Sequence, residues 1–475
     1  MLLIVRFNAS VFQMDRLRHR VFLSLIGCFL VLYSSLILAN QNDTHEYQLK
    51  NGLRLIVKQD HRAPTVAHMV WYRAGSMDEV NGKTGVAHVL EHMMFKGTEK
   101  VKSGDFSRMV AAVGGRENAF TARDFTGYFQ QIEKSKLADV MRLEADRMAN
   151  LKFSDDEFKK EIEVVKEERR LRTEDNPSSL MRELLMATAF VSSPYRHPII
   201  GWMNDLQNMQ ADDARQWYRD WYAPNNAVVV VVGDVKPLEV KTLVEKYYGP
   251  IRAKKLPKRK PQIEPEQKGE KRAILKAPAD SPQIMMAWKV PRVEPNRLDV
   301  IDPYALMVLS AALSGHDNSR LNRELVRTKR LANEAGSSYD SISRGPELFV
   351  IGATAAKGQT TTDLEKGILQ SLQDIAEKGI TDSELKRIKA QLLASQIYKR
   401  DSIFAQAMEI GGSEMADISW RDLDRIIDRI QAVRSDEIKD AVNRYFVKDR
   451  LTVITLDPQP RTNTQPRAVP SGLRH

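Results

Sequence analysis

The spacing of apolar residues along the chain predicts both strands and helices. Residues 47–58 carry two short apolar runs around Asn51-Gly52, a dipeptide that favours the tight turn of a β-hairpin. Residues 64–72 form an apolar, β-rich run suited to a central strand. Residues 227–232 are almost pure valine, which predicts a strand buried on both faces. Residues 136–151 place apolar side chains at helical spacing and predict an amphipathic helix.

A long charged helix is predicted from about residue 154 to about residue 172. Ser154 and Glu157 have the spacing of a capping box at its start. Asp175, Asn176 and Pro177 end it, because proline cannot continue a helix. Further helical segments follow up to the valine strand.

The second half of the sequence repeats the first. Residues 64–71 match residues 282–288, residues 153–160 match residues 380–387, and residues 221–228 match residues 445–452. Self-similarity of this kind predicts two domains of one fold. Strands and helices do not alternate strictly, so we expect two α+β domains, each a mostly antiparallel sheet packed with helices.

An abrupt change of composition marks the boundary between the two domains, where the chain becomes rich in Lys, Pro and Glu. The predicted organisation is a signal peptide or N-terminal anchor at 1–40, a first domain at 45–252, a linker at 253–272, a second domain at 273–457 and a disordered tail at 458–475.

The composition excludes some classes of function. Of 475 residues, 42% are hydrophobic and 28% are charged, as in ordinary globular proteins. The net charge of +10 comes from basic residues scattered among acids, without the clustered basic face that a nucleic-acid or membrane-surface binder needs. Cys28 is the only cysteine, which excludes an intrachain disulfide and a cysteine zinc cage.

The N-terminal stretch predicts export. Basic residues at 16–20 precede an apolar run at 21–38, and the chain turns polar after Ala39, as in a signal peptide. The apolar run is just long enough to span a bilayer, so an uncleaved anchor is the alternative. Residues 25–28 resemble a lipoprotein cleavage box, but the chain stays apolar after Cys28, which argues against lipidation. We expect a periplasmic protein, soluble or anchored to the inner membrane.

The candidate chemistry lies in His88, Glu91 and His92, which form the pattern H-x-x-E-H. Histidines four positions apart on a helix differ by about 40° around its axis, so both imidazoles leave from one face. Two imidazoles with an adjacent carboxylate predict a catalytic zinc site. Glu91 would then act as the base that takes a proton from the zinc-bound water.

A third ligand is expected on the long charged helix. Glu161 and Glu168 lie seven positions apart and share one face, and Val164 and Val165 turn that face inward. Inward-facing carboxylates need a cation or another partner. Glu168 as a ligand with Glu161 behind it satisfies this need, although spacing alone leaves Glu167 as an alternative.

These motifs resemble those of the inverted-zincin peptidases of the pitrilysin family, in particular the bacterial and mitochondrial-processing-peptidase branch. The resemblance rests on residues 88–98, on residues 114–121, and on Glu161 and Glu168, and it extends from about residue 45 to residue 457. It implies His88, His92 and Glu168 as ligands of one zinc ion per chain. It also implies that each chain is half of a clamshell that encloses a chamber for unfolded peptides.

The resemblance implies further substrate contacts. The strand with Asn118, Ala119 and Phe120 would bind the substrate backbone as an added β-strand. Catalytic chains of the family often carry an Arg…Tyr pair in the second domain, but here Arg327 is followed by Asn333 without a tyrosine. We therefore expect a dimer with a second, metal-free homologous subunit that supplies the pair. The alternative is a homodimer in which Arg327 or Tyr339 compensates.

The sequence thus predicts an exported zinc metalloendopeptidase. A rival function is that of a non-catalytic peptide-binding or assembly subunit, which shares this fold. Such a subunit would have a broken zinc motif, whereas the motif at 88–92 is intact.

Overall fold

The computed structural model describes residues 44–460. The predictions for residues 1–40, including the signal peptide or anchor and Cys28, lie outside the described residues, as does the predicted tail from residue 461 onward. Among the described helices, none combines the length and the apolar character needed to cross a bilayer. The described residues from Glu46 onward form one compact unit.

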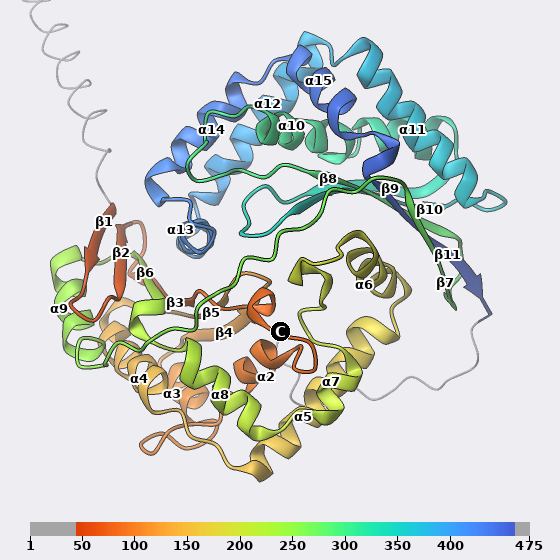
Figure 1. Ribbon diagram of the computed structural model, residues 1–475. Helices are drawn as coiled ribbons and strands as arrows, with labels where there is room; N and C mark the ends of the chain where they lie inside the picture. The colour runs from red at the N-terminus through yellow and green to blue at the C-terminus, as the bar shows by residue number, and fades with distance from the viewer. Residues whose placement is uncertain (1–43, 461–475) are drawn as a thin grey trace, which may run out of the picture. The chain divides into compact units, whose positions relative to one another are not determined.

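The first half of the unit contains a six-stranded sheet in the order β1-β2-β6-β3-β5-β4 (Figure 1). Its strands are β1 (Thr44–Gln48), β2 (Arg54–Gln59), β3 (Thr65–Tyr72), β4 (Arg116–Thr121), β5 (Thr126–Glu133) and β6 (Ala227–Gly233). Its helices are α2 (Val86–Met93), α3 (Asp105–Ala112), α4 (Leu137–Asn150), α5 (Asp155–Arg169), α6 (Pro177–Ala189), α7 (Met203–Asn208), α8 (Ala211–Trp221) and α9 (Pro237–Tyr247).

The second half contains a five-stranded sheet in the order β7-β11-β8-β10-β9. Its strands are β7 (Lys271–Pro278), β8 (Gln283–Val290), β9 (Ala332–Tyr339), β10 (Glu347–Ala355) and β11 (Leu451–Gln459). Its helices are α10 (Asp302–Ser314), α11 (Thr361–Lys378), α12 (Asp382–Lys399), α13 (Ile403–Met415), α14 (Leu423–Ala432) and α15 (Ser435–Tyr445).

Five strands of the first sheet, β2-β6-β3-β5-β4, have the same topology as the second sheet, which confirms the predicted duplication. In the first sheet β2 pairs with β6 in parallel, and β6, β3, β5 and β4 pair antiparallel. In the second sheet β7 pairs with β11 in parallel, and β11, β8, β10 and β9 pair antiparallel. The mostly antiparallel α+β class is therefore correct, with one parallel pair in each sheet.

Each sheet is covered by a helix from the other half (Figure 1). Apolar residues of α13, including Ala407 and Ile410, pack on Trp71 of β3 and on alternate valines of β6. Apolar residues of α6, including Leu185, pack on Ala287 of β8 and on β11. The packing of α13 explains why β6 is almost pure valine. One face of β6 is covered by α13, and the other face is covered by helices of the first half, so both faces are apolar.

The predicted start of the disordered tail at residue 458 is wrong. The strand β11 runs to Gln459, and Pro458 and Gln459 pair with β7. The pairing of β11 with β8 stops at Leu456, so the missing N–H of Pro458 costs no hydrogen bond on that side.

Candidate active site

The helix α2 is fixed at its start by the buried carboxyl group of Glu79. Glu79 accepts hydrogen bonds from the backbone N–H groups of Gly85 and Ala87, at 2.8 and 2.9 Å. Gly85 has a φ of 87°, and a Cβ there would lie 2.5 Å from the carbonyl oxygen of Ile200, so only glycine fits. Apolar residues of α2 pack into the core, including Leu90. The rotation of α2 about its axis is therefore set before any ligand is considered.

The helix α5 brings the third side chain. A capping box at Ser154 starts the helix as predicted, with the Glu157 carboxylate accepting from the Ser154 N–H at 2.8 Å. Ile162 and Val165 are buried, which turns the face with Glu161 and Glu168 toward α2. The side chain of Glu168 is 1% exposed. Glu167 points elsewhere, with its carboxylate 2.8 Å from the guanidinium of Arg170.

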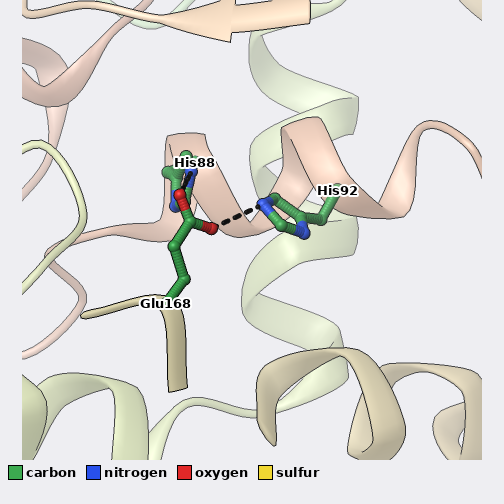
Figure 2. A group of neighbouring side chains, drawn as sticks. All are labelled: His88, His92 and Glu168. Atoms are coloured by element: carbon green, nitrogen blue, oxygen red, sulfur yellow. Dashed lines mark ion pairs between the residues drawn. The ribbon is translucent and has the colours of Figure 1, made fainter. Parts of the chain in front are cut away.

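His88, His92 and Glu168 come together in space, as the sequence predicted (Figure 2). The His88 Nε2 lies 3.8 Å from one Glu168 oxygen, and the His92 Nε2 lies 3.3 Å from the other. The two imidazole rings are 4.8 Å apart between centroids and are inclined by 72°. One ligand atom from each residue lies within 4.8 Å of the other two.

The donor set fits a zinc ion. Two imidazole nitrogens and one carboxylate oxygen are the protein ligands of many catalytic zinc sites. Ligand atoms at about 2.1 Å from a tetrahedral ion lie about 3.4 Å from one another. The separations of 3.3 and 3.8 Å between nitrogen and carboxylate oxygen are close to that value.

Glu161 orients one of the histidines. Its Oε1 lies 2.9 Å from His92 Nδ1, and its other oxygen accepts from the Lys96 ammonium. Burial opposes ionisation of Glu161, but the contacts with His92 and Lys96 lower its pKa. A carboxylate at Nδ1 places the proton of a neutral imidazole there and leaves the lone pair of Nε2 toward Glu168.

The ionisable groups of the site shift one another's pKa values. Burial disfavours the imidazolium of His92, but the Glu161 and Glu168 carboxylates outweigh it and raise the pKa of His92 to about 9. Burial also disfavours the carboxylate of Glu168, but His92, His88 and Arg172 lower its pKa to about 2. Arg172 contributes a guanidinium nitrogen 3.0 Å from Glu168. The site therefore holds a carboxylate whose charge a cation can compensate.

Glu91 lies in the same cavity and is 3% exposed. Burial raises its pKa to about 7, and the Thr121 hydroxyl donates a hydrogen bond to its Oε2. Thr121 is the last residue of β4, and no catalytic role was predicted for it. The contact with Glu91 joins residues from two elements, and no spacing rule predicts such a contact.

The cavity has a volume of about 430 Å³. Its lining includes His88, Glu91 and Glu168 together with residues of β4, of α6 and of the segment after residue 195. The candidate metal ligands His88 and Glu168, the end of β4 and the helix α6 thus line the same cavity.

The predicted substrate-binding residues are divided between two places. Asn118, Ala119 and Phe120 lie on β4, which is an edge strand of the first sheet, and Phe120 also lines the cavity. Arg327 lies in the π-helical turn η6 (Asn322–Thr328), is exposed, and is absent from the residues that line the cavity. Tyr339 donates a hydrogen bond to the Pro291 carbonyl at 2.6 Å and is likewise absent from the lining.

Comparisons with known proteins agree on one family. Residues 54–201 match the family model described as insulinase (peptidase family M16). Residues 208–392 match the model described as the peptidase M16 inactive domain. The second model covers most of the half that lacks an H-x-x-E-H pattern.

Relatives and solved structures cover almost the whole chain. The zinc protease PqqE of Helicobacter pylori is 32% identical over 419 residues, which is 86% of this chain and 92% of the relative. A probable mitochondrial-processing peptidase subunit beta of Arabidopsis thaliana is 25% identical and covers 89% of this chain and 81% of its own. The crystal structure of a protease from Helicobacter pylori superposes with a TM-score of 0.83 at 30% identity and covers 88% of this chain and 100% of its own.

Proposed function

Because the chain belongs to the M16 peptidase family, we propose that it is a zinc-dependent endopeptidase that hydrolyses peptides or unfolded segments. The observation that carries the proposal is the meeting of His88, His92 and Glu168 in the cavity that also holds Glu91. The three residues would hold the zinc ion. A bound zinc ion would supply a Lewis acid that lowers the pKa of water and polarises the peptide carbonyl.

In this proposal Glu91 is the general base. It takes a proton from the attacking water and delivers it to the nitrogen of the leaving amine. Glu91 suits this role because it is buried in the same cavity as the three proposed ligands. The Thr121 hydroxyl fixes one oxygen of Glu91, so the other oxygen is the one that receives the proton.

The outer edge of β4 is proposed to bind the substrate backbone. Edge strands present backbone N–H and C=O groups that an extended peptide can pair with. Pairing along Asn118, Ala119 and Phe120 would direct the peptide toward Thr121 and Glu91, since Thr121 is the last residue of the same strand. The mode requires an extended segment, which favours unfolded substrates over folded ones.

A substitution at Glu91 tests the proposed activity. Glu91→Gln should lower kcat/KM for a quenched peptide by about 10²–10⁴-fold, the usual contribution of a general base. The zinc content should stay near one equivalent per chain, because Glu91 is not a ligand. Unchanged hydrolysis by the Gln variant, or a wild-type chain with less than half an equivalent of zinc, would refute the proposal.

We also propose that the chain works in a dimer that closes a chamber, and that the dimer includes a metal-free homologous subunit. The support is that Arg327 is followed by Asn333 without a tyrosine, so this chain lacks the Arg…Tyr pair that a second subunit would supply. Pull-down followed by mass spectrometry tests this proposal and should recover such a subunit. A fully active homodimer would contradict it.

Export to the periplasm stays a proposal that rests on residues 16–39 of the sequence. Fractionation of cells that express the full chain tests it. Recovery of the protein in the cytoplasmic fraction would contradict export.

A further inference from the structure

Arginines are concentrated around the cavity that holds Glu91. Four of them line it: Arg123 after β4, Arg172 in the π-helical turn η3 (Arg170–Glu174), Arg182 on α6, and Arg196 at the end of the short helix η4 (Pro194–Arg196). They come from four segments that are distant in the sequence, so the concentration is a product of the fold.

Three of these arginines lack a carboxylate partner. Arg172 pairs with Glu168, but Arg123, Arg182 and Arg196 form no ion pair within the part of the chain that the structure describes. Arg123 lies over the ring of Tyr195, 5.2 Å from its centroid. Arg196 donates to the backbone carbonyl of Val191 at 3.0 Å, which leaves its charge uncompensated.

The carboxylates of the lining are engaged elsewhere. Glu168 faces the two histidines and Arg172, and Glu183 lies 2.8 Å from the guanidinium of Arg169, outside the group of four. Outside the lining, Glu347 acts electrostatically on both Arg123 and Arg182, and Asp340 acts on Arg123. Burial raises the pKa of Asp340. Burial and the neighbouring Asp340 raise the pKa of Glu347 to about 8, so it carries little charge at neutral pH.

We propose that this cavity binds a carboxylate of the substrate, carried by a residue next to the cleaved bond, and that the enzyme therefore prefers acidic peptides. The inference rests on the proposed peptidase function and adds the substrate class. Arginine suits the role, because its planar guanidinium matches a carboxylate with two parallel hydrogen bonds.

The position of the arginines explains why the proposed preference for an acidic side chain concerns a residue next to the cleaved bond. They share the cavity with Glu91 and the three candidate ligands, so a side chain that they hold belongs to a residue close to the reacting carbonyl. The lining also includes apolar side chains of Met186 and Ile199, which can contact the methylene groups of an acidic side chain.

A matched set of quenched peptides tests the inference. Within each series the peptides differ at a single residue, which is Glu, Gln or Lys. In one series this residue precedes the cleaved bond, and in the other it follows the cleaved bond. We expect kcat/KM for Glu to exceed that for Gln by at least tenfold, and Lys to be the poorest. A parallel pair with a free or an amidated C-terminus distinguishes a side-chain carboxylate from a terminal one. Equal values for Glu and Gln, with no effect of the terminal carboxylate, would overturn the inference.

Variants assign the preference to the cavity. Arg182→Gln should reduce the Glu-to-Gln ratio at least threefold, and Arg182→Glu should reverse the order in favour of Lys. Arg142→Gln is the matched control, since Arg142 is exposed on α4 and forms no ion pair within residues 44–460. An unchanged ratio in both Arg182 variants would overturn the assignment.

Binding measurements separate this inference from the proposed function. Fluorescence anisotropy with the Glu91→Gln variant reports the affinity for each peptide without hydrolysis. If the wild-type chain fails to cleave but Glu peptides still bind at least tenfold more tightly than Gln peptides, the peptidase proposal fails and the carboxylate site stands. If cleavage occurs and neither kcat/KM nor affinity distinguishes the peptides, the carboxylate site fails alone.

Discussion

At the scale of single residues, two adjacent carboxylates of α5 have different environments. Glu168 lies beside the two histidines and is 1% exposed, whereas Glu167 pairs with Arg170 and its side chain is 22% exposed. Spacing in the sequence could not separate them, because both lie near the inward face of the helix. The packing of Ile162 and Val165 decides which one turns toward α2.

Glu168→Gln should therefore abolish stoichiometric zinc binding, with an affinity loss larger than the 10–100-fold that the loss of an outer partner typically costs. Glu167→Gln is the control and should bind zinc like the wild type. Isothermal titration with zinc measures both. Equal losses in the two variants would contradict the assignment of Glu168 as a ligand.

Other residues of the site could not be predicted from sequence. The positions of His88, Glu91 and His92 follow from one short motif on one helix. Three further residues act through contacts between different segments: Thr121, Lys96 and Glu79. Thr, Lys and Glu usually lie at the surface or at helix caps, so their residue types did not mark them. Spacing along the chain carries no information on such contacts.

At the scale of elements, the exchanged helices α6 and α13 tie the two halves together. The strands, the capping boxes and the repeat were predictable, because each has a local pattern. The exchange was not, because an apolar stripe shows that a helix is buried but not which sheet covers it. The valine pattern of β6 predicted that both faces of the strand are buried. It did not predict that one face is buried by α13 of the second half.

The packing of α13 gives a prediction with an internal control. A Cβ on Gly411 would lie 2.1–2.5 Å from indole atoms of Trp71, whereas one on Gly412 would have no atom within 4 Å. Gly411→Ala should destabilise the protein by about 1–3 kcal/mol through overpacking. Gly412→Ala should stabilise it by up to about 1 kcal/mol through helix propensity.

Urea unfolding of the two variants measures the difference. Because both changes add one methyl group to the same helix, only the position of Trp71 distinguishes them. Equal free energies of unfolding for the two variants would show that α13 does not pack on β3 as described.

At the scale of the whole molecule, the segment between the two sheets is held in place. Residues 251–270 contain neither helix nor strand. Within them, Glu264 accepts hydrogen bonds from the backbone N–H groups of Val191, Ser192 and Ser193 and lies 2.6 Å from the Lys289 ammonium. The linker composition predicted a connection, but it did not predict these contacts, which depend on both halves being folded.

Glu264 makes the stability depend on pH. Burial opposes its ionisation, but Lys289 and the three N–H groups lower its pKa to about 2. A carboxyl with a depressed folded-state pKa stabilises the fold above its unfolded pKa of about 4.3 and loses this contribution as the pH falls toward 2. Glu264→Gln should thus cost about 2 kcal/mol at pH 7.

The loss of unfolding free energy caused by Glu264→Gln should shrink steadily between about pH 5 and pH 3, because the wild-type carboxyl is then progressively protonated in the unfolded chain. Urea titrations at pH 7, 5 and 3 measure it. Glu266→Gln is the control, since Glu266 is exposed and forms no ion pair in the described part of the chain, and it should have no effect. A pH-independent cost would contradict the account.

We propose that His88, His92 and Glu168 hold one catalytic zinc ion per chain. The most direct measurement is the hydrolysis of a quenched peptide by the full chain, first stripped of metal with a chelator and then titrated with zinc. We expect no hydrolysis without metal, a rise in proportion to added zinc, and a plateau at one equivalent per chain. Hydrolysis that survives the chelator, or that does not return with zinc, would contradict it.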